Sequence, residues 1–300
     1  LLRKFIIWAS CFAYMVNLVR TEYLERIPDW YKTNDEQDLV LSDDIDSLVT
    51  VSILASVKSN WHVNYFYDFN TLFINEGIMD CKNKIQRRIW CDVACLRQEK
   101  CFDNHISRKY TTDIKNNLCI NPNLIADVSA YHYTDKYAGS TALLVWSLYN
   151  IPLPKTEEGK MLLLAIDSTF KGFYDSRFTD RNKFFLCDVL GLEELYEVEQ
   201  RHTAQEFYQI ISKYGLSAKI KCVDGRLETK LDLETIGELL NIKIVLQMEN
   251  KYIGYVAFEE HTANMCGVGS VKDLSKGLVT LAFTFRNNAK YSIVKKKLVA

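Results

Sequence analysis

Apolar and polar positions alternate along the first half of this chain in the order expected of an α/β protein. An apolar run at 39–42 predicts a buried strand, and apolar positions between 48 and 54 then recur at helical spacing. Further strands are predicted at 63–69, 88–93, 101–106 and 161–166, with a helix at 140–149. Because strands and helices follow one another in turn, we predict an α/β fold with a mostly parallel sheet.

The pattern changes to a smaller α+β type after about residue 190. It predicts a helix pair at 193–214, a hairpin of 219–223 and 227–231 around Asp224-Gly225, and strands at 242–248, 252–258 and 278–285. The first thirty-odd residues are predicted to be helical, ending near Pro28. We therefore divide the chain into an N-terminal helical extension at 1–36, an α/β domain at 37–190 and an α+β domain at 191–300.

Charge and cysteine content narrow the class of protein. The 37 Lys and Arg residues nearly cancel the 38 Asp and Glu residues, so any binding of a polyanion must be local. Nine cysteines, an odd number without framework spacing, are typical of reduced thiols and indicate a cytoplasmic protein.

An apolar run at 5–16, close to the start of the sequence, is flanked by basic residues. It is shorter than the roughly 20 apolar residues that a membrane span needs. No small-residue cleavage pattern of a signal peptide follows it. We expect a helix that is buried or faces a protein partner, and no membrane role.

Acidic side chains follow several of the predicted strands. Asp44 and Asp46 come after the first strand, and Asp92, Asp103 and Asp167 come at or near the ends of later ones. Carboxylates at the carboxyl ends of neighbouring parallel strands converge, and hard divalent cations such as Mg²⁺ or Mn²⁺ relieve their repulsion. Two such ions, roughly 3.5–4 Å apart, would clamp a phosphoryl group and activate water for in-line attack.

The order and spacing of these motifs resemble the DHH phosphoesterase family. The motifs are Asp44-Ile45-Asp46, a lone Asp92, Asp103-Asn104-His105, Gly139-Ser140-Thr141 and Asp167-Ser168-Thr169-Phe170. The resemblance covers roughly residues 37 to 175. The family includes manganese pyrophosphatases, single-strand exonucleases, and oligonucleotide and cyclic-dinucleotide phosphodiesterases.

The resemblance implies a manganese or magnesium site. Asp44 and Asp46 would each favour one metal, and Asp92 and Asp167 would bridge both. Asn104 would be the remaining metal ligand, at a position where the family has a His.

The resemblance also implies catalytic and substrate-binding roles. His105 would contact the scissile phosphate and would act with Asp92 in catalysis. Ser140 and Thr141, at a predicted helix N-terminus, would support an anion, although simple helix capping is an alternative.

The second domain of such enzymes closes over the site and selects the substrate. This sequence lacks the Gly-Gly-His signature of the commoner second domain. Arg286 and Lys290, which bracket the Asn287-Asn288 turn, are candidates for phosphate contact by position, and a solvated turn is the alternative.

Three positions depart from the family pattern and leave a second function open. Asn104 replaces a His, and Val40 and Ser42 stand where the family has a His or Asp before its paired aspartates. We predict a metal-dependent phosphoesterase, such as a nuclease, that hydrolyses a phosphodiester or phosphoanhydride in a nucleotide or short single-stranded nucleic acid. The alternative is a catalytically degenerate scaffold that binds a nucleic acid, a nucleotide or a protein partner.

Two other patterns have structural alternatives. Cys91, Cys95, Cys101 and His105 could be drawn as a zinc site, but the cysteines lie in or beside apolar runs and are expected to be buried thiols. The 131–137 segment, rich in tyrosine and containing Lys136, could stack on a base, although aromatic packing is the commoner use.

Overall fold

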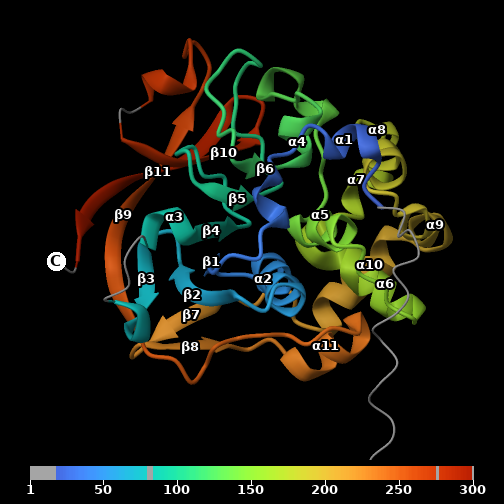
Figure 1. The fold of residues 1–300 in the computed structure, drawn as a ribbon. Helices are drawn as coiled ribbons and strands as arrows, with labels where there is room; N and C mark the ends of the chain where they lie inside the picture. Colours follow the sequence, from blue (N-terminus) through green and yellow to red (C-terminus); the bar gives the residue numbers. More distant parts are fainter. Residues whose placement is uncertain (1–17, 80–83, 275–276, 299–300) are drawn as a thin grey trace, which may run out of the picture.

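The computed structural model describes residues 18–79, 84–274 and 277–298. The apolar run at 5–16, and the partner-facing helix expected there, lie outside the described residues. A nine-stranded sheet organises the rest of the chain, in the strand order β10-β11-β9-β3-β2-β1-β4-β5-β6 (Figure 1). The strands are β1 Gln37–Leu41, β2 Trp61–Tyr67, β3 Thr71–Asn75, β4 Arg88–Cys91, β5 Lys100–Phe102, β6 Cys119–Ile120, β9 Tyr252–Asn264, β10 Leu278–Phe285 and β11 Asn288–Lys297.

The sheet is mixed. Strand β1 pairs in parallel with β2 and β4, and the parallel part continues through β5 to β6. The remaining pairs, β2 with β3, β3 with β9, β9 with β11 and β11 with β10, are antiparallel. Our expectation of a mostly parallel sheet therefore holds for the β2-β1-β4-β5-β6 half alone. The same sheet continues across the boundary predicted at residue 190, since it includes β9, β10 and β11. The sheet therefore belongs to both predicted domains, and the division of the chain into domains stays a prediction.

Both faces of the sheet are covered, which explains the unbroken apolar run of β1. Leu39 and Leu41 belong to the core beneath the helices, whereas Val40 belongs to a second core on the opposite face. Successive side chains of a strand point to opposite faces, so a strand that is buried on both faces is apolar throughout.

Helices cover one face of the parallel half. The longer helices are α2 Ile45–Val57, α5 Thr141–Leu148, α6 Glu157–Ala165, α9 Glu193–Arg201, α10 Ala204–Lys213 and α11 Leu233–Leu240. In Figure 1, α5, α6, α9 and α10 lie on the side of the molecule away from β9 and β11. Every residue of α5 is buried, as expected of a helix that is apolar all round and packed inside a core.

The remaining described elements are short. They are α1 Thr21–Leu24, α3 Lys84–Arg87, α4 Pro122–Ile125, α7 Lys171–Tyr174, α8 Thr179–Lys183, the 3₁₀ helices at Asp29–Lys32, Glu76–Ile78, Ala130–Asp135, Ile166–Ser168 and Val271–Asp273, the π-helical turn Phe184–Val189, and the hairpin of β7 Ile220–Val223 with β8 Arg226–Thr229. The predicted helix pair at 193–214 and the predicted β7–β8 hairpin are confirmed. None of the helices within the described ranges is long and apolar enough to cross a membrane.

Two predicted strands are wrong. The apolar run 161–166 is mostly the end of helix α6, because the Thr156 hydroxyl caps the backbone N–H of Gly159 and commits the segment to a helix. The run 242–248 forms no strand; the backbone N–H of Val245 instead donates to the Ser52 hydroxyl on α2. Short apolar runs do not distinguish strands from other buried segments.

The C-terminal strands close over the carboxyl ends of β4 and β5. The backbone N–H of Leu281 on β10 donates to the carbonyl of Ala94, and that of Phe283 donates to the carbonyl of Ile106. The sheet therefore curls, and it brings β10 and β11 beside the loops that follow the parallel strands.

Candidate functional site

The candidate site lies at the carboxyl edge of the parallel strands. Asp44 follows β1, Asp92 directly follows β4, and Asp103 directly follows β5. Because these three strands are neighbours, their carboxylates meet at one edge, as the sequence predicted.

Asp46 is held by the N-terminus of α5. Its two carboxylate oxygens accept hydrogen bonds from the backbone N–H groups of Thr141 (2.8 Å) and Ala142 (2.7 Å). Such donors favour an ionised carboxylate. Burial, followed by repulsion from Asp92 and Asp167, nevertheless raises the pKa of Asp46 well above its ordinary value. Negative charge at this edge therefore exceeds what the protein compensates.

Asp92 is the central carboxylate of the cluster. One oxygen accepts a 2.9 Å hydrogen bond from the Thr141 hydroxyl, and the residue has a positive φ of 59°. Burial and the repulsion of Asp44 raise the pKa of Asp92 to about 8, although His105 acts in the opposite direction. A non-glycine residue in the left-handed region is strained, and such strain is commonly found at functional sites.

Asp167 reaches the same cleft from a different kind of element. It follows helix α6 instead of a strand, and it too has a positive φ, of 49°. Its carboxylate accepts a 2.9 Å hydrogen bond from the Asn104 amide, which also donates to the carbonyl of Gly139. Burial and Asp44 raise the pKa of Asp167, against the lowering effect of His105.

Asn104 has one buried oxygen with no hydrogen-bond partner, its side-chain Oδ1. The residue is 6% exposed, so water does not readily satisfy this atom. A buried acceptor without a partner is costly. An uncharged oxygen ligand for a cation is one use for it, as predicted from the motif.

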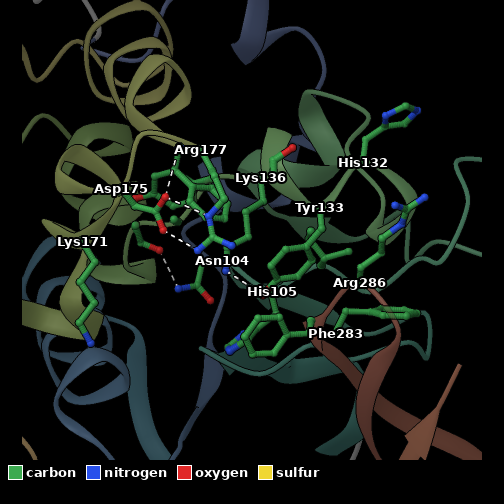
Figure 2. A pocket seen from close by; sticks show the side chains of 18 of the residues that line it. Asn104, His105, His132, Tyr133, Lys136, Lys171, Asp175, Arg177, Phe283 and Arg286 are labelled. Carbon is green, nitrogen blue, oxygen red and sulfur yellow. Dashed lines mark hydrogen bonds and ion pairs between the residues drawn. The ribbon is translucent and has the colours of Figure 1, made fainter.

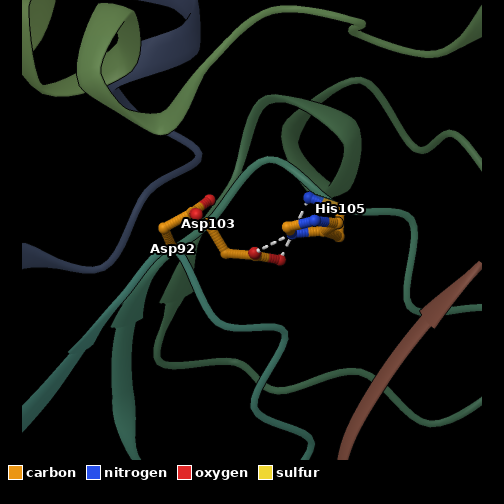
Figure 3. Close-up of side chains that lie close together, drawn as sticks. All are labelled: Asp92, Asp103 and His105. Atoms are coloured by element: carbon orange, nitrogen blue, oxygen red, sulfur yellow. Dashed lines mark hydrogen bonds and ion pairs between the residues drawn. The ribbon is translucent and has the colours of Figure 1, made fainter. Parts of the chain in front are cut away.

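His105 is oriented by Asp103. The ring Nδ1 lies 2.7 Å from the Asp103 carboxylate (Figure 3). That carboxylate also accepts hydrogen bonds from the Asn121 side chain and from the backbone N–H of His105. Burial alone would lower the pKa of His105, but Asp103, with Asp92 and Asp167, raises it to about 10. The ring is therefore an imidazolium near neutral pH. Ligand atoms of Asp92, Asp103 and His105 lie within 4.8 Å of one another, so these three side chains could hold a metal ion.

Lys219 supplies a cation that the sequence did not point to. Its ammonium lies 2.9 Å from the carboxylate of Asp43 and 3.3 Å from that of Asp44. The backbone N–H of Ile220 donates to the carbonyl of Asp43, which fixes the start of β7 against the cluster. No local pattern announces a contact between residues about 175 positions apart.

Three cavities meet at these side chains. Asp44 lines the two smaller ones, of about 250 and 460 Å³. His105 lines the 460 Å³ cavity and the largest, of about 880 Å³, while Asp167 lines the largest and the smallest. Figure 2 shows the largest, with His105 and Asn104 among the side chains around it. The acidic cluster is thus reached from three sides.

The predicted substrate-binding residues are placed differently from one another. Ser140 and Thr141 are buried, and both are engaged: Ser140 caps α5, and Thr141 holds Asp92 and Asp46. These contacts favour the capping alternative and a role in orienting carboxylates, and direct substrate contact stays a prediction. Arg286 lines the 880 Å³ cavity and Lys290 the 460 Å³ cavity, where its ammonium lies 3.6 Å from Glu260.

The alternative zinc set is not brought together. Cys91 belongs to the core beneath the helices, whereas Cys95 and Cys101 belong to the core on the other face of the sheet. The buried-thiol interpretation agrees with this arrangement, since all three are buried and free.

The oxygen atoms at this edge belong to the carboxylates of Asp44, Asp46, Asp92 and Asp167 and to the unpartnered amide of Asn104. Among the His, Cys, Asp and Glu side chains of the described residues, those of Asp92, Asp103 and His105 have ligand atoms close enough to one another to share one ion. Carboxylate and amide oxygens suit Mg²⁺ and Mn²⁺.

No family model, no curated protein and no solved structure matches this chain. Function must therefore be argued from the site itself.

Proposed function

We propose that this protein is a divalent-metal-dependent phosphoesterase of the DHH type, which hydrolyses a phosphodiester or a phosphoanhydride. One observation carries the proposal: three buried carboxylates from three separate segments, Asp46, Asp92 and Asp167, lie at a single cleft, where burial raises the pKa of each and neighbouring carboxylates raise it further. A fold that brings such charges together without enough protein cations pays for them in stability. Binding of a divalent cation removes that penalty.

The cations of the protein do not balance the cluster. His105 and Lys219 are the basic side chains that contact it most directly, against the carboxylates of Asp44, Asp46, Asp92 and Asp167. Lys219 pairs with Asp43 as well as with Asp44, so its single positive charge is shared between two carboxylates. A Mn²⁺ or Mg²⁺ ion supplies the missing positive charge, and when bound it polarises a phosphoryl oxygen and lowers the pKa of water.

His105 has the properties of a hydrogen-bond donor to the phosphate. Its Nδ1 is anchored on Asp103, and its Nε2 has no hydrogen-bond partner among the described residues. In hydrolysis the oxygen of water forms a bond to phosphorus and the water gives up a proton, while the bond from phosphorus to the leaving oxygen breaks and that oxygen takes up a proton. Because Asp103 raises the pKa of His105, the ring favours the imidazolium form, which can donate a hydrogen bond from Nε2 to the phosphate.

Asn104 and Lys219 support a second candidate, a catalytically degenerate scaffold that binds a nucleotide, a nucleic acid or a protein partner. An amide is a weaker metal ligand than an imidazole. The ammonium of Lys219 already pairs with Asp44, one of the expected metal ligands. The two candidates differ in whether bound metal leads to hydrolysis.

We also propose roles for the two predicted domains, a cellular compartment and a class of substrate. Residues 37–190 would form the metal-binding domain, residues 191–300 would help to select the substrate, and the protein would act in the cytoplasm. Its substrate would be a phosphate-containing small molecule or a short single-stranded nucleic acid.

Calorimetric Mn²⁺ titration tests the proposal, combined with hydrolysis assays on pyrophosphate, a dinucleotide, a cyclic dinucleotide and short oligonucleotides. We expect the wild type to bind Mn²⁺ and to hydrolyse at least one of these substrates. Asp92→Asn should lose both activities. Asp224→Asn is a matched control, since Asp224 also has a positive φ but lies exposed on the β7–β8 turn. Mn²⁺ binding that is equal in wild type and Asp92→Asn would refute the site, whereas binding without hydrolysis would favour the scaffold.

A further inference from the structure

The largest cavity differs in character from the acidic cluster at its inner end. It measures about 880 Å³, and its wall combines aromatic and cationic side chains, among them Tyr131, Tyr133, Lys136, Lys171, Phe285 and Arg286 (Figure 2). Pockets of this size hold ligands larger than a phosphate ion.

The aromatic part of the wall is rigid and open. Phe285, at the end of β10, is 62% exposed, and its ring stacks on that of Tyr133 with centroids 6.0 Å apart and planes 17° from parallel. The Tyr133 hydroxyl donates a 2.7 Å hydrogen bond to the carbonyl of Thr284, which fixes the ring that supports Phe285. A rigid aromatic face next to a cavity offers a stacking platform for a base.

The cationic part of the wall lacks acidic partners. Within the described ranges, Lys136, Lys171 and Arg286 have no carboxylate within 4 Å, whereas Arg177 in the same wall is paired with Asp175 at 2.7 Å. Each of these three cations lies over a tyrosine ring instead of against a carboxylate, so their charge is not neutralised and favours an anionic ligand in the cavity. Stacking surface and unpaired cations together match a ligand that has both a flat ring and phosphate groups.

We propose that this cavity binds the nucleoside part of a nucleotide-containing substrate, with the base stacked on Phe285 and the flanking phosphate held by Lys136 and Lys171. The inference rests on the proposed function, because His105 and Asp167 at the inner end of the cavity place the scissile phosphate next to the metal ligands. A substrate without a base, such as inorganic pyrophosphate, would leave the aromatic wall unused.

The test compares the binding of AMP and ribose 5-phosphate to the full chain by calorimetry with Mn²⁺ present. These probes share the phosphate and differ in the base. We expect AMP to bind about tenfold more tightly, a difference of ~1.4 kcal/mol that lies within the range for one stacked base. Phe285→Ala should remove this difference by weakening AMP alone, and Phe285→Tyr should restore it. Lys171→Gln should weaken both ligands alike, whereas the exposed Lys155→Gln, outside the cavity wall, should weaken neither.

The inference and the proposed function fail in different ways. Equal affinity for AMP and ribose 5-phosphate, or an AMP affinity unchanged by Phe285→Ala, would overturn the inference and leave a phosphoesterase of base-free substrates. Base-dependent binding without hydrolysis of any nucleotide would uphold the inference and refute the enzyme. Because the Phe285 side chain is mostly exposed, its truncation should leave the melting temperature unchanged, which separates a lost contact from a lost fold.

Discussion

The metal-free protein should lose stability as the pH rises, because it retains a proton on Asp92 that the unfolded chain releases. The ordinary pKa of this carboxyl is 3.8, and in the fold it is about 8. Between these values the folded state binds more protons than the unfolded state, so the free energy of unfolding falls by about 1.4 kcal/mol per pH unit for this one group. By pH 7 the accumulated loss is at most on the order of 4 kcal/mol.

Other titrating groups leave a clear window at pH 5 to 6. Glu157 and Glu206 have lowered pKa values, so the stability that they contribute is complete above about their ordinary value of 4.5 and is lost only as the pH falls below it. The pKa of His105 is raised from 6.5 to about 10, so its contribution is complete below 6.5 and is lost as the pH rises toward 10. Inside the window the slope comes from buried carboxyls with raised pKa values, those of the cluster and that of Glu199, whose pKa burial raises to about 9.

The perturbation is Asp92→Asn. Asparagine tolerates the positive φ of this position, and its side-chain oxygen can still accept the hydrogen bond from Thr141, so the change removes the charge with little else. Urea unfolding at pH 5.0, 5.5 and 6.0 in EDTA should show a slope that is smaller in the variant by about 1.4 kcal/mol per pH unit. Asp224→Asn should keep the wild-type slope. With Mn²⁺ present, the wild type should become more stable than Asp92→Asn, the reverse of the order expected in EDTA. The reason is that the metal stabilises the wild type alone. Parallel slopes in EDTA would refute the account of Asp92 as a protonated, uncompensated carboxylate.

Three further changes probe the neighbours of Asp92. Thr141→Val removes the hydroxyl that orients Asp92 and should weaken Mn²⁺ binding by roughly 10- to 100-fold in calorimetry, whereas Thr141→Ser should not. Lys219→Met removes the competing ammonium and should tighten Mn²⁺ binding by roughly fivefold, the worth of ~1 kcal/mol for a half-exposed ion pair; weaker binding would contradict the competition. Asn104→His should tighten Mn²⁺ binding and raise turnover, because imidazole is the stronger ligand; an unchanged Mn²⁺ affinity would place Asn104 outside the metal's ligands.

Local sequence rules found the strand-end carboxylates and missed what long-range pairing brings to them. Asp44, Asp92 and Asp103 follow β1, β4 and β5 as predicted, because the carboxyl ends of parallel strands share one edge. The strand proposed before Asp167 is a helix, yet the side chain still reaches the cleft through Asn104. The order of the motifs along the chain pointed to Asp167 as part of the site, whereas the apolar run in front of it wrongly predicted a strand.

The extension of the sheet could not be read from local pattern. The strands β9 and β10 were predicted near their observed places, but the pairing of β3 with β9 joins residues more than 175 positions apart. The contact of Lys219 with the cluster has the same origin, since β7 is docked by a backbone hydrogen bond to the carbonyl of Asp43. Such contacts depend on tertiary packing, which neither periodicity nor a short motif encodes.

The segment 242–248 shows why apolar content alone misleads. Ile242, Ile244 and Leu246 pack against the main core without forming a strand, and the backbone N–H of Ile242 closes the end of α11 by donating to the carbonyl of Gly237. The residues are apolar because the segment covers the core next to α2, and this requirement is met by an irregular backbone as well as by a strand.

The deviations from the family pattern acquire a common physical meaning once the site is built. Val40 lies in the second core, so no ligand can come from that position, and under the proposal Asn104 would supply an uncharged oxygen in place of an imidazole. Lys219, which is not one of these deviations, adds a positive charge on the Asp44 side. These three features would reduce the negative charge or ligand strength offered to cations. Such a site should bind fewer metal ions, or bind them more weakly, than a site with a full set of ligands. Comparing the stoichiometry of Mn²⁺ binding by the wild type and by Lys219→Met would measure how much of the loss in metal binding is due to Lys219.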